Sequence, residues 1–453
     1  MRFLRLGAFF TALALLLTAC ASAPADGGSG SSTREEPPAD ISGSALPQAI
    51  PLVLWSLPEP PRLILTQEDV DAALIQVMEE YSAAAVSVAT VEQGQLSQAG
   101  AWGWAVKNQR EMTPDTKVRV ASISKVVVAM CAMSMADEGL IDLDAPLSDH
   151  WGSGVRNPYS EGQPSVRTLM THTSSLRNLE ITRGLSHLRG LLQRPSTWRS
   201  MEPGNGGYWY YSNFGLCVLG TTLELACGGL LENYLQERFL QPLGASASFY
   251  SETLEAGQLA ALYTTGGVGR SVAEQMTQTT PTQIGQTASY FPGGFTASAR
   301  DMAKLAAVLA NDGVYKEPVY RSVELESTQD AQDIVGVILQ LMENQYTETR
   351  LLSAESVEAL EQPYFTVDPI TSSPFQQCLI LRRQEDLLGQ DVLYYHTGSA
   401  YGVFALMTYN PETRNGVVVL TTGAPRNTDD RGLYALCADL SEKLYEKMDG
   451  DPI

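Results

Sequence analysis

The order in which strand-like and helix-like segments follow one another constrains the fold of this chain most strongly. Strand-like runs at 84–91 and 96–106 predict a β-hairpin. A long, mostly helical stretch follows, and strands return only near the end of the chain. These late strand-like runs cover 378–382, 392–396, 401–409 and 417–422. A βαβ winding would alternate strands and helices throughout. We therefore predict an α/β (α+β) fold with an antiparallel sheet built from both chain ends and flanked by helices, and a mostly helical subdomain inserted at about 122–350.

Helix start signals support this outline. Thr66 and Asp69 look like a capping box that opens the first helix after the N-terminal region. Ser298 opens another predicted helix, which ends near Gly313. A last helix is predicted at 431–447, where leucines recur on one face.

Composition excludes several classes of protein. The chain has 453 residues, of which 44% are hydrophobic, so an intrinsically disordered chain is excluded and a sizeable core is expected. Its 30 Lys and Arg against 51 Asp and Glu give a net charge of −21, which repels phosphate backbones, so we expect no nucleic acid partner. Only four His are present, without Cys-x-x-Cys or His-Glu-x-x-His, so we predict neither a metal nor another cofactor.

The N-terminal region is predicted to contain a targeting signal followed by a flexible tether. Arg2 and Arg5 precede an apolar run, and Leu-Thr-Ala-Cys ends it at Cys20. This resembles a bacterial lipoprotein signal peptide at 1–19, which implies acylation of Cys20, a membrane-anchored protein and an extracytoplasmic location; an ordinary secretory signal is the alternative. The segment 20–50 is rich in Ala, Ser, Gly and Pro and is predicted to be a flexible tether, so the folded domain is expected at 51–453.

The first chemical motif is Ser122-Ile123-Ser124-Lys125 at the start of a predicted apolar helix. The three-residue offset puts the Lys125 amine on the same face as the Ser122 hydroxyl, one turn away. The helix N-terminus also favours developing negative charge on that hydroxyl. Ser-x-x-Lys alone is a weak signal, because about one match arises by chance in a chain of this length.

The second and third motifs are weaker when each is taken alone. Tyr211-Ser212-Asn213 could supply a general base, if a cation such as Lys125 lowers the phenol pKa, and an amide for a substrate carbonyl; a loop packed on the core is the alternative. In His396-Thr397-Gly398-Ser399 on a late strand, Gly398 allows close approach of substrate, and the amide of Ser399 could pair with that of Ser122 as an oxyanion hole. A strand that merely ends in a turn is the alternative there.

The three motifs in this order resemble the serine β-lactamase and penicillin-binding-protein family, and within it class C β-lactamases, D-alanyl-D-alanine carboxypeptidases and related esterases. The resemblance covers about 65–448 and implies a β-lactamase/transpeptidase-like fold for a serine hydrolase. The separation between the second and third motifs is 396 − 211 = 185 residues, long for the family, and we assign the excess to an acidic insert at 314–349.

The resemblance also implies roles for individual residues. Ser122 is expected to be the acylated nucleophile, Lys125 its activating partner, and Tyr211 the base that relays protons to the leaving group and from water. The residues with an implied role in substrate binding are Asn213, His396, Thr397, Gly398 and Ser399.

One position departs from the family pattern. The β-lactamases and cell-wall peptidases usually carry Lys-Thr-Gly, whereas His396 stands in the Lys position here. A histidine with its ordinary pKa is charged only in part near pH 7. We therefore expect weakened recognition of substrate carboxylates, and a preference for anionic substrates that grows as the pH falls from 8 to 6.

Three classes of function remain in competition. The first is a serine hydrolase that acts on an amide or ester, such as a peptidoglycan stem peptide, a β-lactam or a small ester. The second is a non-catalytic penicillin- or peptidoglycan-binding lipoprotein that acts as a sensor or scaffold, against which the intact Ser122, Lys125, Tyr211 and Asn213 argue. The third is a Ser-His-Asp hydrolase, which the lack of Gly-x-Ser-x-Gly disfavours.

Overall fold

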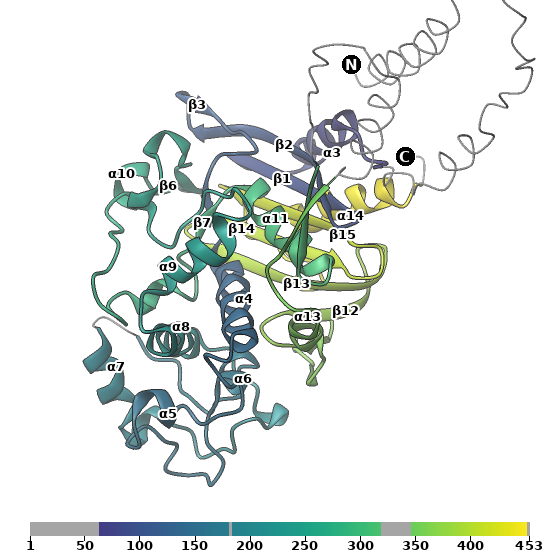
Figure 1. Ribbon diagram of the computed structural model, residues 1–453. Helices are drawn as coiled ribbons and strands as arrows, with labels where there is room; N and C mark the ends of the chain where they lie inside the picture. Colours follow the sequence, from purple (N-terminus) through teal and green to yellow (C-terminus); the bar gives the residue numbers. More distant parts are fainter. Residues whose placement is uncertain (1–62, 181–183, 319–345, 451–453) are drawn as a thin grey trace, which may run out of the picture. The chain divides into compact units, whose positions relative to one another are not determined.

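The computed structural model describes residues 63–180, 184–318 and 346–450 (Figure 1). The predicted signal peptide, Cys20, the predicted tether and the first residues of the predicted domain lie outside the described residues.

A nine-stranded antiparallel sheet is the centre of the domain and joins the two ends of the chain (Figure 1). Its order is β10-β11-β12-β13-β14-β15-β1-β2-β3, so the C-terminal strands meet the N-terminal hairpin where β1 pairs with β15, with Val88 opposite Val419. This confirms the predicted sheet. The strands are β1 Ala85–Glu92, β2 Gln95–Val106, β3 Arg110–Glu111, β10 Phe365–Val367, β11 Phe375–Gln377, β12 Arg382–Leu387, β13 Gln390–Ala400, β14 Val403–Asn410 and β15 Asn415–Thr422.

Helices cover both faces of this sheet, because its central strands are apolar on both sides. Val86 and Val88 of β1 pack into a cluster with α3 Gln67–Glu80 and α14 Ala435–Met448. Ala85 and Ala89, which point to the opposite face, belong to the main core together with α11 Ala299–Ala310. Both predicted helix starts are correct, since Thr66 and Ser298 each form a capping box with an Asp three residues later.

The regular elements in the described part of the inserted segment are mostly helices, as predicted. The helix after the nucleophile motif, α4 Ser124–Asp137, is buried on nearly all sides, which fits its apolar sequence. Its neighbours in the chain are α5 Ser148–Trp151, α6 Val166–Met170, α7 Leu185–Leu192, α8 Asn213–Cys227, α9 Leu231–Leu235 and α10 Val272–Gln275, with α13 Ala354–Glu361 following the insert. No single helix in the described ranges is long and apolar enough to cross a membrane; α8 with the segment Leu231–Leu240 would pass as a pair, but the two are bent by 77°.

Two segments differ from the expectations. Within the predicted insert, β8 Val314–Pro318 pairs with β9 Tyr346–Arg350, and the residues between them lie outside the described ranges. The predicted strand at 378–382 is wrong, because Cys378 donates from its backbone to Leu381 O at 2.9 Å and closes a turn between β11 and β12. The apolar side chains of this turn are buried, which gives it the composition of a strand.

Candidate active site

Ser122 lies in a strained turn at the start of α4. The 3₁₀ turn Ala121–Ile123 carries it, and Ala121 has φ +49°, in the left-handed region that a side chain disfavours. The hydroxyl of Ser124 holds this turn, since it donates to Ala121 O at 2.6 Å and accepts from Phe295 N at 3.0 Å. Strain of this kind persists where the surroundings fix the backbone, and it is frequent at functional sites.

Lys125 contacts Ser122 from within the core. Its Nζ donates to Ser122 Oγ at 3.1 Å and to Pro292 O at 2.6 Å, which confirms the contact that the three-residue offset predicts. The side chain is fully buried, and burial lowers the pKa of Lys125, with Tyr211 acting in the opposite direction. A lysine of lowered pKa can be neutral often enough to accept a proton from Ser122.

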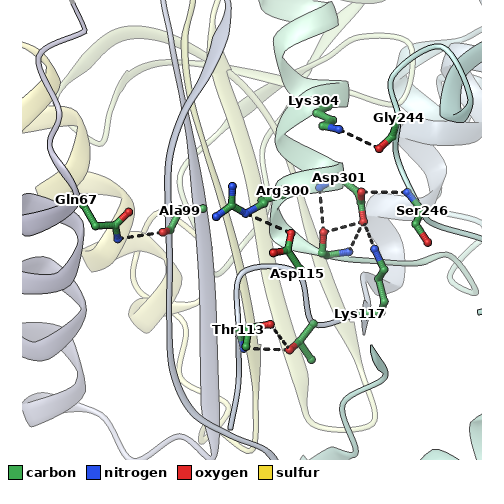
Figure 2. Close-up of polar contacts among 12 residues, drawn as sticks. Gln67, Ala99, Thr113, Asp115, Lys117, Gly244, Ser246, Arg300, Asp301 and Lys304 are labelled. Atoms are coloured by element: carbon green, nitrogen blue, oxygen red, sulfur yellow. Dashed lines mark hydrogen bonds and ion pairs between the residues drawn. The ribbon is translucent and has the colours of Figure 1, made fainter. Parts of the chain in front are cut away.

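The strand before the nucleophile is fixed by a buried ion pair (Figure 2). Lys117 Nζ lies 2.7 Å from an oxygen of Asp301, whose carboxylate also accepts from the backbone of Ser246 at 3.2 Å. Lys117 directly precedes β4 Val118–Arg119, which pairs with β7 Thr296–Ala297. The pair therefore connects α11 to the segment that leads into Ser122.

Tyr211 lies beside Lys125, on the loop that enters α8. The Lys125 Nζ is 4.9 Å from the centre of the Tyr211 ring. The His172 ring also packs against Tyr211, with the two ring centres 4.6 Å apart and the ring planes tilted by 48°. Burial lowers the pKa of His172 to about 3, so this ring is neutral near pH 7. Its Nδ1 accepts from Ser212 N at 3.4 Å, which fits a positioning role.

The third motif lies against the nucleophile turn along β13. A Cβ on Gly398 would lie 2.3 Å from Val120 O, so only glycine permits this approach. The pairing of β12 with β13 ends at Arg382 and Tyr395, so the edge of β13 beyond Tyr395 has no β12 partner. Thr397 on this edge is half-buried, whereas Ser399 is exposed and lines the same cavity as Ser122.

His396 is neutral, although it stands where the family pattern has a positively charged lysine. It is 2% exposed, and its Nδ1 lies 2.7 Å from Thr397 O. Burial holds the pKa of His396 well below its usual value, and the positive charges of Arg382 and Lys125 lower it further. The expected growth of its charge between pH 8 and pH 6 is therefore corrected, because the imidazole stays neutral over that range.

A cavity of about 620 Å³ opens beside the nucleophile. Of the eight predicted site residues, three line this cavity: Ser122, Asn213 and Ser399. The other five do not line it: Lys125, Tyr211, His396, Thr397 and Gly398. Sequence reasoning missed Arg119, Arg270 and Tyr401, which also line it. Arg119 lies three residues before Ser122, and Tyr401 lies two residues after Ser399. Their closeness to these motifs in the sequence was the one signal that could have identified them. Arg270 is far from every motif in the sequence, so no such signal existed for it. No group of three His, Cys, Asp or Glu in the described ranges could hold a metal ion.

The sheet with its helical insert, together with a Ser-x-x-Lys turn facing a late strand, defines the class of serine β-lactamase-like proteins. Residues 70–441 match the family described as Beta-lactamase, and the chain belongs to this family.

Curated relatives match over limited segments. The chain is 28% identical over 145 residues to the D-alanyl-D-alanine-carboxypeptidase/endopeptidase AmpH of Escherichia coli K12, covering 30% of this chain and 37% of that protein. It is 30% identical over 198 residues to the esterase EstB of Burkholderia gladioli, covering 38% and 49%. The matches thus span less than half the length of these relatives.

Solved structures share the fold of this chain. The octameric penicillin-binding protein homologue from Pyrococcus abyssi has a TM-score of 0.61 at 19% identity, and the match covers 85% of this chain and 78% of that chain.

Proposed function

We propose that the protein is a serine hydrolase that cleaves an amide or ester through an acyl-enzyme on Ser122. The observation that carries this proposal is the hydrogen bond of 3.1 Å between Lys125 Nζ and Ser122 Oγ, made by an amine whose pKa burial lowers. A nucleophile and a base within hydrogen-bond reach, held on rigid elements, are the requirement for this chemistry. Membership of the family and the names of the relatives support the same class of reaction.

The reaction follows from the positions of the groups. Neutral Lys125 accepts the Ser122 proton as Oγ attacks the substrate carbonyl, and the backbone amides of Ser122 and Ser399 stabilise the oxyanion. Tyr211, in contact with Lys125, passes that proton to the departing amine or alkoxide as its bond to the carbonyl carbon breaks. Water then attacks the acyl group on Ser122, with its proton returned along the same groups. Ser122 is thereby regenerated and an acid is released.

The proposed substrates are peptidoglycan-type D-amino-acid peptides, β-lactams or small esters. Carboxypeptidase and esterase among the names of the relatives favour these acyl donors. His396 is neutral and contributes no charge toward a carboxylate on the leaving group. We therefore expect esters and amides with neutral leaving groups to be cleaved as well as D-alanyl peptides or better.

Labelling with a fluorescent fluorophosphonate and a fluorescent penicillin tests the nucleophile. We expect a covalent adduct on the peptide that contains Ser122, and its loss in Ser122→Ala. Ser246→Ala is the matched control, because Ser246 is exposed and outside the cavity wall. An adduct that persists in Ser122→Ala would contradict the assignment. An adduct on Ser122 that is never released, with no turnover of esters or peptides, would instead favour the penicillin-binding sensor or scaffold.

We further propose that the mature protein is attached to the outer side of the bacterial cell membrane through acylated Cys20. The apolar segment that ends in Leu-Thr-Ala-Cys and the Ser/Gly-rich stretch after it support this location.

A further inference from the structure

Two arginines lie over the same aromatic ring in the wall of the cavity beside Ser122. The guanidinium carbon of Arg119 is 5.4 Å from the centre of the Tyr401 ring, and that of Arg270 is 4.8 Å from it. Arg119 is only 8% exposed, although it carries a charge. Neither arginine takes part in an ion pair among the described residues, so both charges are available to a ligand.

The backbone around this ring is held in an unusual conformation. Tyr401 and Gly402 form the turn between β13 and β14, and Tyr401 has φ +52°, which is rare for a bulky residue. A Cβ on Gly402 would lie 1.9 Å from Tyr263 O, so the turn rests on β5 Leu262–Thr264. Arg270 ends β6 Gly267–Arg270, the partner of β5, and is therefore fixed relative to Tyr401.

The position of these groups identifies the half of the substrate that they meet. The cavity wall contains Ser122, Asn213 and Ser399 together with the two arginines and Tyr401. The Tyr211 ring, by contrast, lies 4.9 Å from the Lys125 Nζ, which contacts Ser122 from within the core, and it does not line this cavity. Because the proton donor must lie beside the leaving group, we assign the side of Ser122 that the arginines line to the acyl half of the substrate.

The charge of this wall is opposite to that of the whole chain. The protein has a net charge of −21, yet the acidic group in the cavity wall is Glu274, whose carboxylate accepts from Ser271 N at 2.7 Å at a helix start. Two guanidinium groups against one carboxylate leave the wall net positive. Guanidinium groups recognise carboxylates through short, charge-assisted hydrogen bonds.

We propose that Arg119 and Arg270, together with the Tyr401 ring that both guanidinium groups contact, form an acyl-side subsite that selects substrates with a carboxylate in the acyl portion. This inference rests on the proposed acyl-enzyme hydrolase and names its substrate class. It differs from recognition of a carboxylate on the leaving group, since His396 and Tyr211 lie outside the wall of this cavity.

The test compares 4-nitrophenyl hydrogen pimelate with 4-nitrophenyl methyl pimelate, which share the acyl chain and the leaving group and differ in the terminal charge. We expect the wild type to prefer the acid in kcat/KM, and Arg270→Gln and Arg119→Gln each to lower the preference about tenfold, as loss of a charge-assisted hydrogen bond does. Arg270 is half-buried, whereas Arg119 is buried, so the Arg270 variant is expected to disturb folding less. Arg194→Gln changes an exposed arginine that does not line the cavity; it controls for net charge and should keep the preference.

The outcomes separate this inference from the proposed function. Hydrolysis that requires Ser122, with no preference for the acid in the wild type or with the same preference in both cavity variants, would overturn the subsite and leave the hydrolase standing. A fall in preference that Arg194→Gln reproduces would overturn it as well. If neither ester is hydrolysed in a Ser122-dependent way and no label reaches Ser122, the proposed function fails, and the subsite fails with it.

Discussion

Gly398 shows how the lack of a side chain can position a nucleophile. Its backbone packs against Val120 O, two residues before Ser122, and a Cβ would come within 2.3 Å of that oxygen. Real Cβ atoms do not approach backbone oxygen so closely, so an added methyl group must displace either β13 or the nucleophile turn. Either movement separates Ser122 from the Ser399 amide.

Gly398→Ala is therefore expected to slow acylation of Ser122 by about a hundredfold, because a displacement of about 1 Å in an active site can cost that much. The measurement is the rate of fluorophosphonate labelling. Gly257→Ala is the matched control, since a Cβ there meets nothing within 4 Å. Equal labelling rates in both variants, with unchanged urea unfolding midpoints, would show that the close approach does not set the geometry.

Single residues also show where sequence reasoning succeeds and where it stops. The contact between Ser122 and Lys125 was predictable because helical spacing alone fixes it; its catalytic role stays a prediction. The neutral state of His396 was not predictable, because its pKa depends on burial and on Arg382, fourteen residues away in the chain. Arg270 was missed because its position also depends on tertiary structure. It lies on the hairpin of β5 and β6, which is far from every motif in the sequence but lines the cavity in the fold.

At the scale of elements, the start of α11 connects the sheet to the nucleophile. Asp301 caps this helix with Ser298 and, at the same time, pairs with Lys117 before β4 (Figure 2). The side chains of Lys117 and Asp301 are 5% and 8% exposed, so each charge depends on the other for compensation.

We expect Asp301→Asn to lower the free energy of unfolding by about 3–5 kcal/mol, since it leaves the Lys117 ammonium buried without a counter-charge. Asp115→Asn is the matched control, because Asp115 pairs with Arg300 in the first turn of the same helix, where the two side chains are 71% and 42% exposed. Such a surface pair is worth below about 1 kcal/mol. Urea unfolding of the three proteins measures both effects. If both variants lose the same free energy of unfolding, burial does not make the pair of Lys117 and Asp301 more important than the exposed pair.

Element boundaries followed the sequence where local signals were strong. The capping boxes at Thr66 and Ser298 and the hairpin of β1 and β2 were predicted because neighbouring residues determine them. The segment 378–382 was mistaken for a strand because its residues are apolar. They are apolar since the turn fits into the core beneath α6, where Ile380 N donates to Met170 O at 2.9 Å.

At the scale of the whole molecule, the order of elements predicted the sheet. The strand-like runs lie near the two ends of the folded domain, and pairing them in one sheet lets both sets of apolar strands be buried in one core. The cavity could not be predicted in the same way. Its wall combines Leu179 with the segments 119–122, 213–217, 270–278, 289–294 and 399–401. No periodicity or spacing in the chain relates 270–278 to the others, so only the folded arrangement reveals the cationic wall.

The proposed attachment to a membrane also belongs to this scale, and Cys20→Ser tests that proposal. A single acyl chain gives only marginal membrane binding, whereas several chains on one residue, each burying CH₂ groups worth about 0.8 kcal/mol apiece, hold a protein firmly. We therefore expect the wild type in the membrane fraction, released only by detergent, and Cys20→Ser in the soluble fraction with its Ser122 labelling retained. Cys227→Ser, a half-buried thiol of the folded domain, is the matched control and should stay with the membrane. If Cys20→Ser still requires detergent for release, the attachment depends on another segment of the chain, and the proposed acylation at Cys20 is wrong.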